Sequence, residues 1–182
     1  ALGTFGIAMT ISARLGRISF SGLATLFMAY AGLEGIFFGT ALPAFASAFG
    51  GGIIWTAFGT AALVFLIAVA YGVLSQSDMT SLGRILSIAV MGLVAVTLLY
   101  MVLSFFMPMT KMMLVISYLG LIVFVGLTAY DANQIRNMSQ QVDGYSTMSM
   151  KLSLIMALRM YINVIMIFWY LLQIFASSSN RR

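Results

Sequence analysis

Long apolar runs separated by short polar breaks make up almost the whole chain. A helix that crosses a lipid bilayer needs roughly 20 apolar residues. Runs close to or above that length cover residues 18–45, 53–74, 85–107, 112–130 and 152–176, and a shorter run covers residues 1–13. The pattern predicts an all-α polytopic membrane helix bundle that forms one transmembrane domain over residues 1–182.

The breaks between the runs contain residues that end helices. The run 18–45 is followed by Gly50, Gly51 and Gly52. The run 85–107 is followed by Pro108, and a proline cannot continue a helix interior. The run 1–13 is too short to span by itself. We interpret it as the tail of a span whose start is not in this chain, and an interfacial helix is the alternative.

Composition excludes most other classes of protein. Hydrophobic residues make up 62% of the chain and charged residues only 7%, whereas soluble domains carry about a quarter charged residues. The absence of Cys and His excludes thiol nucleophiles, disulfides, the usual zinc sites and a Ser-His-Asp triad. We therefore predict no enzyme and no cofactor. The net charge of +5 comes from scattered cations and does not indicate a nucleic-acid partner.

The distribution of Lys and Arg predicts the orientation, because short cytoplasmic loops carry most cations. The cations of the first, third and fifth loops are Arg14, Arg17, Arg84, Arg136 and Lys151. The other two loops contain only Lys111, so the first group should face the cytoplasm. Arg181 and Arg182 conflict with this orientation if the last run crosses the membrane. We favour a full crossing over a re-entrant hairpin.

Four polar residues lie in or beside the runs, where burial without a partner is costly. Glu34 lies well inside the second run, between glycines that allow close helix approach. It is either a protonated carboxyl group that forms a hydrogen bond between helices or a relay position for ions or protons. Asp131 closes the fifth run, and it is either an interfacial carboxylate or part of a buried site.

Arg159 and Asn163 are four residues apart and share one face of the last run. Arg159 could extend to the cytoplasmic interface. Otherwise it needs a partner, and Asp131 is the natural one because the predicted topology places both on the same side.

Three stretches of the chain resemble the Bax inhibitor-1-like proteins, also called the transmembrane Bax inhibitor motif family. Residues 53–65 with 77–84 are similar to its third and fourth helices, and Val123 to Asp131 with Gln134 and Ile135 resemble its sixth helix, which ends in Tyr-Asp. Residues 156–172 are similar to its last helix. Arg14 and Arg17 resemble a basic pair that ends its second helix.

The resemblance implies a seven-helix bundle with a central last helix, and the family's first helix is absent from this chain. It also implies a pH-sensitive calcium leak channel of a bacterial inner membrane. Family members sense pH with two aspartates on the last two helices and a basic residue from the second. Carried onto this chain, the first aspartate is Asp131, the basic partner is Arg14 or Arg17, and the second aspartate falls at Asn163.

Asn163 and Arg159 depart from the family pattern. Asn163 cannot ionise, and Arg159 adds a positive charge where the family has an uncharged residue. Calcium could still bind at Asp131, but we expect a fixed Asp131–Arg159 pair and a weak or absent pH response near neutrality. The alternative is a non-conducting protein that regulates or binds a membrane-bound AAA protease or the translocation machinery.

Overall fold

The computed structural model describes residues 19–105, 110–140 and 147–179. Within them the chain forms five helices and no strand: α2 (Phe20–Phe49), α3 (Gly52–Leu74), α4 (Thr80–Leu103), α5 (Thr110–Ser139) and α6 (Thr147–Ser179). All five are long and apolar enough to cross a membrane. The prediction of an all-helical membrane bundle is confirmed, and the seven-helix count remains a prediction. The run 1–13, Arg14 and Arg17 lie outside the described residues.

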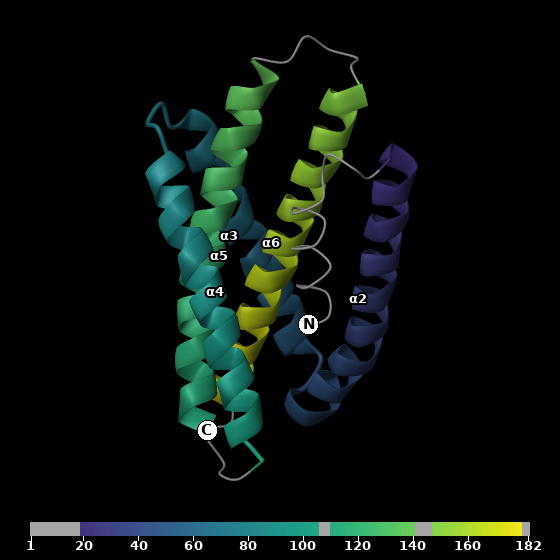
Figure 1. The fold of residues 1–182 in the computed structure, drawn as a ribbon. Coiled ribbons are helices and arrows are strands. Elements are labelled where there is room, and N and C mark those ends of the chain that lie inside the picture. Colours follow the sequence, from purple (N-terminus) through teal and green to yellow (C-terminus); the bar gives the residue numbers. More distant parts are fainter. Residues whose placement is uncertain (1–18, 106–109, 141–146, 180–182) are drawn as a thin grey trace.

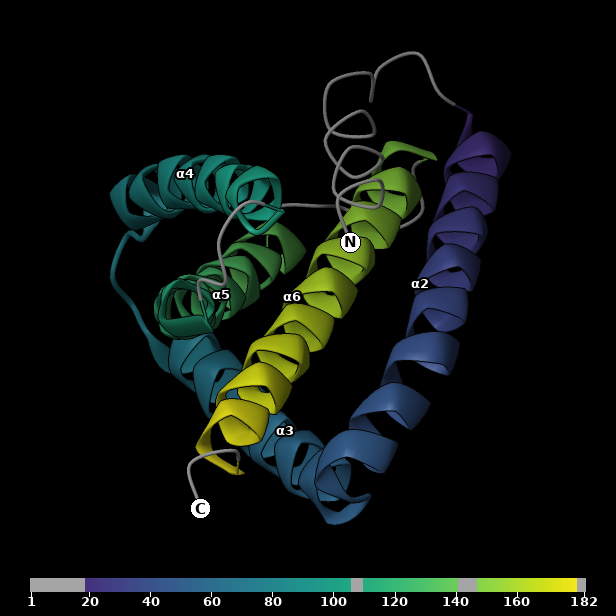
Figure 2. The same ribbon diagram turned by 90° about the horizontal axis from the view of Figure 1, so that it is seen from below.

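Consecutive helices run in opposite directions (Figure 1). The starts of α2, α4 and α6 therefore lie at the same end of the bundle as the ends of α3 and α5. Helix α6 lies between α2 on one side and α3 with α5 on the other, whereas α4 packs against α5 (Figure 2). Between Leu154 and Ser177 only Ala157 is exposed. The expected central position of α6 agrees with this arrangement in the described part of the chain.

Helices α5 and α6 both extend beyond the apolar runs that predicted them. Helix α5 continues past Tyr130 to Ser139, and α6 begins at Thr147 and not at residue 152. The predicted bounds 112–130 and 152–176 were too short because several polar side chains after Tyr130 bond to neighbouring helices. Asn133 and Arg136, for example, donate to backbone oxygens at the end of α3.

The bounds of α2 and α4 also differ from the prediction. Helix α2 continues to Phe49 and ends at Gly50, which has φ of 84°. Such a conformation is readily available only to glycine. Helix α4 begins at Thr80 and ends at Leu103, whereas the predicted range was 85–107. Just before this start, the Asp78 side chain accepts hydrogen bonds from the Thr80 backbone N–H and hydroxyl.

The cations of the described residues follow the predicted alternation. Arg84, Arg136 and Lys151 lie near the end of the bundle where α4 and α6 begin, and Lys111 lies near the opposite end. Helix α6 is one continuous helix of 33 residues, so it is not a re-entrant hairpin. One buried core lies between α3, α4, α5 and α6, and a smaller one lies between α2 and α6. Many apolar side chains of α3 and α4 face outwards, as expected of surfaces in lipid.

Candidate functional site: a buried ion pair between α5 and α6

Asp131 is fully enclosed between α5 and α6, with 1% of its surface exposed. Its Oδ1 lies 2.5 Å from Nη2 of Arg159. Its Oδ2 accepts a hydrogen bond of 2.7 Å from Nδ2 of Asn163. Both partners come from one face of α6, because they are four residues apart. We refer to Asp131, Arg159 and Asn163 as the latch.

Arg159 has two further partners on α5. Its Nη1 donates to Oε1 of Gln134 at 3.1 Å, and its guanidinium carbon lies 5.8 Å from the centre of the Tyr130 ring. A guanidinium at that distance from an aromatic face is attracted to it. The Arg159 side chain is 33% exposed, whereas the Asp131 side chain is 2% exposed. Arg159 is therefore the member of the pair that lies nearer the surface of the bundle.

Glycines bring the neighbouring helices close to the segment of α5 that carries the latch. A Cβ atom on Gly72 of α3 would overlap the backbone carbonyl of Ala129, and one on Gly83 of α4 would overlap the Tyr130 ring. Only a residue without a side chain permits such contact at these two places. The residues around Asp131 are thus packed against α3, α4 and α6.

The donor set of the latch does not form a calcium site in this arrangement. Calcium takes six to eight oxygen ligands, and both oxygens of Asp131 are already bonded to nitrogen donors. Among the described residues there is no group of three or more His, Cys, Asp or Glu side chains that could hold a metal ion. A cation could interact with Asp131 only after Arg159 has moved away.

Comparison with known proteins assigns the chain to a family. The family model described as inhibitor of apoptosis-promoting Bax1 matches residues 1–180. The chain belongs to the Bax inhibitor-1 family. It is also 53% identical to a protein of Chlamydia muridarum over 179 residues, which cover 98% of this chain and 75% of that protein.

More distant relatives match over nearly the same length. The inner membrane protein YbhL of Escherichia coli K12 is 31% identical over 182 residues, covering 100% of this chain and 73% of YbhL. A protein of Deinococcus radiodurans is 32% identical over 174 residues, covering 95% of this chain and 71% of that protein. Together with the five apolar helices, the family assignment makes this chain an integral membrane protein.

In this Bax inhibitor-1 family member, the structure brings together Asp131, Arg159 and Asn163, and of the alternatives left open for Arg159 it has the pair with Asp131. The roles assigned to them stay predictions. Arg14 and Arg17, the predicted basic partners, lie outside the described residues. The partners that sequence reasoning missed are Tyr130 and Gln134. The spacing of Gln134, three residues after Asp131 on the same helix, could have indicated that it shares the face that meets Arg159.

Glu34 lies on a different side of α6 from the latch. It is 4% exposed and belongs to the face of α2 that also buries Leu23 and Tyr30. The Tyr30 ring meets the ring of Tyr161 of α6 edge to face at 6.0 Å. Glu34 therefore lies on the face of α2 that packs against α6, and the two roles considered for it stay predictions.

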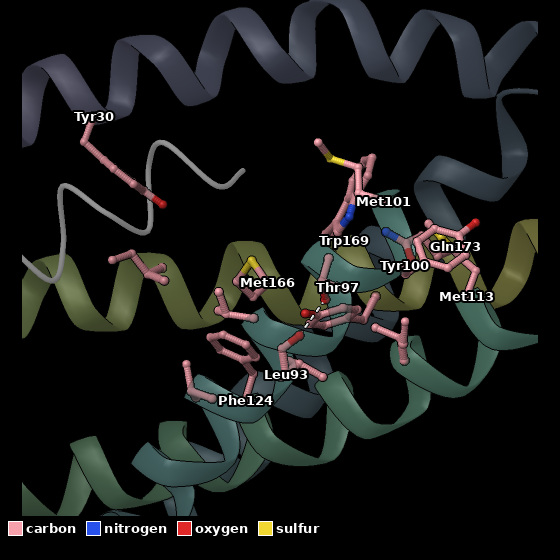
Figure 3. A pocket seen from close by; sticks show the side chains of 15 residues that line it. Tyr30, Leu93, Thr97, Tyr100, Met101, Met113, Phe124, Met166, Trp169 and Gln173 are labelled. Carbon is pink, nitrogen blue, oxygen red and sulfur yellow. Dashed lines mark hydrogen bonds between the residues drawn. The ribbon is translucent and has the colours of Figure 1, made fainter. Parts of the chain in front are cut away.

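A cavity of about 260 Å³ lies between α4, α5 and α6 (Figure 3). Tyr100, Met113 and Gln173 gather at one end of it, and Tyr30 approaches from α2. Along α6 the lining extends from Gln173 to Ile162, the residue before Asn163. At the end of the cavity that is farther from the latch, polar groups are supplied by Thr97, Tyr100 and Gln173.

Proposed function

We propose that this chain is a calcium-permeable leak pathway of a bacterial inner membrane, held closed by the latch. Membership of the Bax inhibitor-1 family and similarity to YbhL, which is named an inner membrane protein, support the location. The family resemblance supports the activity. The calcium ion is the transported substrate in this proposal, not a resident cofactor.

The observation that carries the proposal is the bonding of both oxygens of a buried carboxylate. Asp131 is the acid to which the family resemblance assigns pH sensing. Its Oδ1 is paired with the Arg159 guanidinium, and its Oδ2 accepts a hydrogen bond from Asn163. The guanidinium of Arg159 lies against Asp131, at the position that a transported cation would need. Opening therefore requires separation of Arg159 from Asp131.

In the proposed pathway, the cavity is the part of the route that approaches the latch from the end of the bundle where α6 ends. Its lining extends along α6 to Ile162, next to Asn163. Phe124, at the same end of the cavity, precedes Asp131 by seven residues, or about 10 Å of helix rise. In the proposed pathway the latch and these apolar side chains separate the cavity from the cytoplasmic end.

Calcium influx into proteoliposomes tests the proposal, using the full-length protein and its Arg159→Gln variant. Removal of the guanidinium frees the carboxylate, so influx at pH 7 should rise about tenfold or more. A shift of about 1.4 kcal/mol toward the open state gives that factor. The double variant Asp131→Asn with Arg159→Gln should return to the parent's low influx, because it lacks the carboxylate.

Lys151→Gln is the matched control, because it removes a cation of the same helix that is not part of the latch. It should leave influx at the parent's level. If Arg159→Gln folds normally and conducts no more than protein-free vesicles, the leak function is wrong. That result would favour a non-conducting protein that binds a membrane protease or the translocation machinery, and co-purification of such a partner would identify it.

A further inference from the structure

Side chains of α5 bond to backbone oxygens at the end of α3, in addition to the bond from the Ser75 backbone N–H to the Tyr71 oxygen. The last carbonyl oxygens of a helix have no partner within that helix. Here Nδ2 of Asn133 donates to the backbone oxygens of Gly72 at 3.1 Å and Ser75 at 3.0 Å. Nη1 of Arg136 donates to the same Ser75 oxygen at 2.8 Å. We call Asn133 and Arg136 the α3 cap.

The main member of the α3 cap is buried and fully bonded. Asn133 is 4% exposed, and its Oδ1 accepts a hydrogen bond of 3.2 Å from Nδ2 of Asn137. Its two amide hydrogens serve the two α3 carbonyls. The positive charge of Arg136 also lies at the negative end of the α3 dipole, where a cation is favourable. The contact is therefore both directional and electrostatic.

The α3 cap and the latch act on opposite faces of the same helical segment. Asp131 and Asn133 are two residues apart, which is about 200° around an α-helix. Asp131 is bonded to α6 and Asn133 to α3. A rotation of α5 about its axis would therefore break the bonds of Asp131 to α6 and those of Asn133 to α3 together. The close approach of Gly72 to Ala129 also prevents a sideways shift at this level.

We infer that Asn133 is a positioning residue that holds Asp131 in register with Arg159 and Asn163. The α3 cap fixes the rotation of α5, so the latch forms only while the end of α3 is in place. Any effect of Asn133 on ion flux rests on the function proposed above. Its effect on the contact between Asp131 and Arg159 is independent of that function, and the test therefore measures this contact directly.

Solid-state NMR of the full-length protein in lipid bilayers measures this contact. With ¹³C in the aspartate carboxyl groups and ¹⁵N in the arginine guanidinium groups, dipolar dephasing reports carboxyl–guanidinium pairs. The Asp131 signal is assigned by its loss in Asp131→Asn. Dephasing should be strong in the parent and largely lost in Asn133→Leu, which removes both donors at similar volume.

Asn137→Leu is the matched control, because it alters the neighbouring amide without removing a bond to α3. It should keep the dephasing of the parent. Strong dephasing in folded Asn133→Leu would overturn the inference, whatever the calcium influx of these variants. If Asn133→Leu does not fold, Asn133→Ala replaces it, since it removes the same two donors and leaves a smaller side chain. Unchanged dephasing in that variant would also overturn the inference.

Discussion

At the scale of single residues, the balance between Asp131 and Arg159 decides the character of the site. A carboxylate with so little exposed surface is stable only if its charge is compensated. Arg159 supplies the charge and Asn163 supplies a hydrogen bond to the second oxygen. Since Asn163 cannot ionise, the latch contains only one acid, and no pair of carboxyl groups can share a proton there.

Asp131→Asn should destabilise the protein although it changes few atoms. Arg159 would keep its charge but lose its partner, and breaking a buried pair in this way costs roughly 3–5 kcal/mol. Because Arg159 is a third exposed, we expect about 3 kcal/mol, measured by denaturant unfolding in detergent. The same change at the exposed carboxyl of Asp78 should leave the unfolding free energy close to that of the parent, since the Asn oxygen can accept the same hydrogen bonds from Thr80. Equal stability of Asp131→Asn and the parent would show that the pair contributes nothing.

At the scale of helices, the segment of α5 after Tyr130 shows where sequence reasoning succeeds and where it stops. The contact of Asp131 with Arg159 could be predicted because the i to i+4 spacing and the shared membrane side depend only on local order. The contact of Asn133 with the end of α3 could not, because it depends on the rotation of α5 and on the close approach at Gly72. The same contact explains why the apolar run ended earlier than the helix.

Gly72→Ala should destabilise the protein, because its Cβ would meet the backbone of Ala129, which cannot move aside. Overpacking of this kind costs about 1–3 kcal/mol. Gly59→Ala in the same helix is the matched control, since nothing lies within 4 Å of its Cβ. That change should be neutral or stabilise by up to about 1 kcal/mol, the difference in helix propensity. Equal unfolding free energies for the two variants would contradict the close packing of α3 and α5.

The start of α4 should respond to acid through Asp78. Hydrogen bonds from the Thr80 hydroxyl and backbone N–H hold the pKa of Asp78 below its ordinary value of 3.8. A lowered pKa means that the cap is fully present above the ordinary value and is lost as the pH falls through the lower one. Hydrogen exchange should therefore show the protection factor of the Thr80 amide constant down to about pH 4 and falling below it.

Asp78→Asn provides the comparison for this experiment. Its amide cannot titrate, so the protection factor of Thr80 should not depend on pH in the same range. A parallel fall in both proteins would mean that another group controls the start of α4.

At the scale of the whole molecule, the bundle places the latch where the central helix meets its closest neighbour. Helix α6 packs against α2, α3 and α5, and the cavity beside it ends next to Asn163. The apolar pattern was sufficient to predict five spanning helices. It could not locate the cavity, which depends on how side chains from four helices meet.

The pH response of calcium influx separates this chain from the two-aspartate pattern that its family resemblance implies. The latch has one carboxyl group, a guanidinium and an amide, and the chain contains no His. An Asn163→Asp and Arg159→Gln double variant should instead bring two carboxyl groups together. Such a pair titrates in separate steps, so this variant should respond to pH and shows that the assay can detect a response.

Calcium influx of the unmodified protein into proteoliposomes between pH 6 and 8 is the most direct test of a fixed latch. The account predicts low influx that does not change across this range, because Asp131 is paired with Arg159 and the latch holds no second carboxyl group that could share a proton with it. A steep change in influx between pH 6 and 8 in the unmodified protein would contradict it.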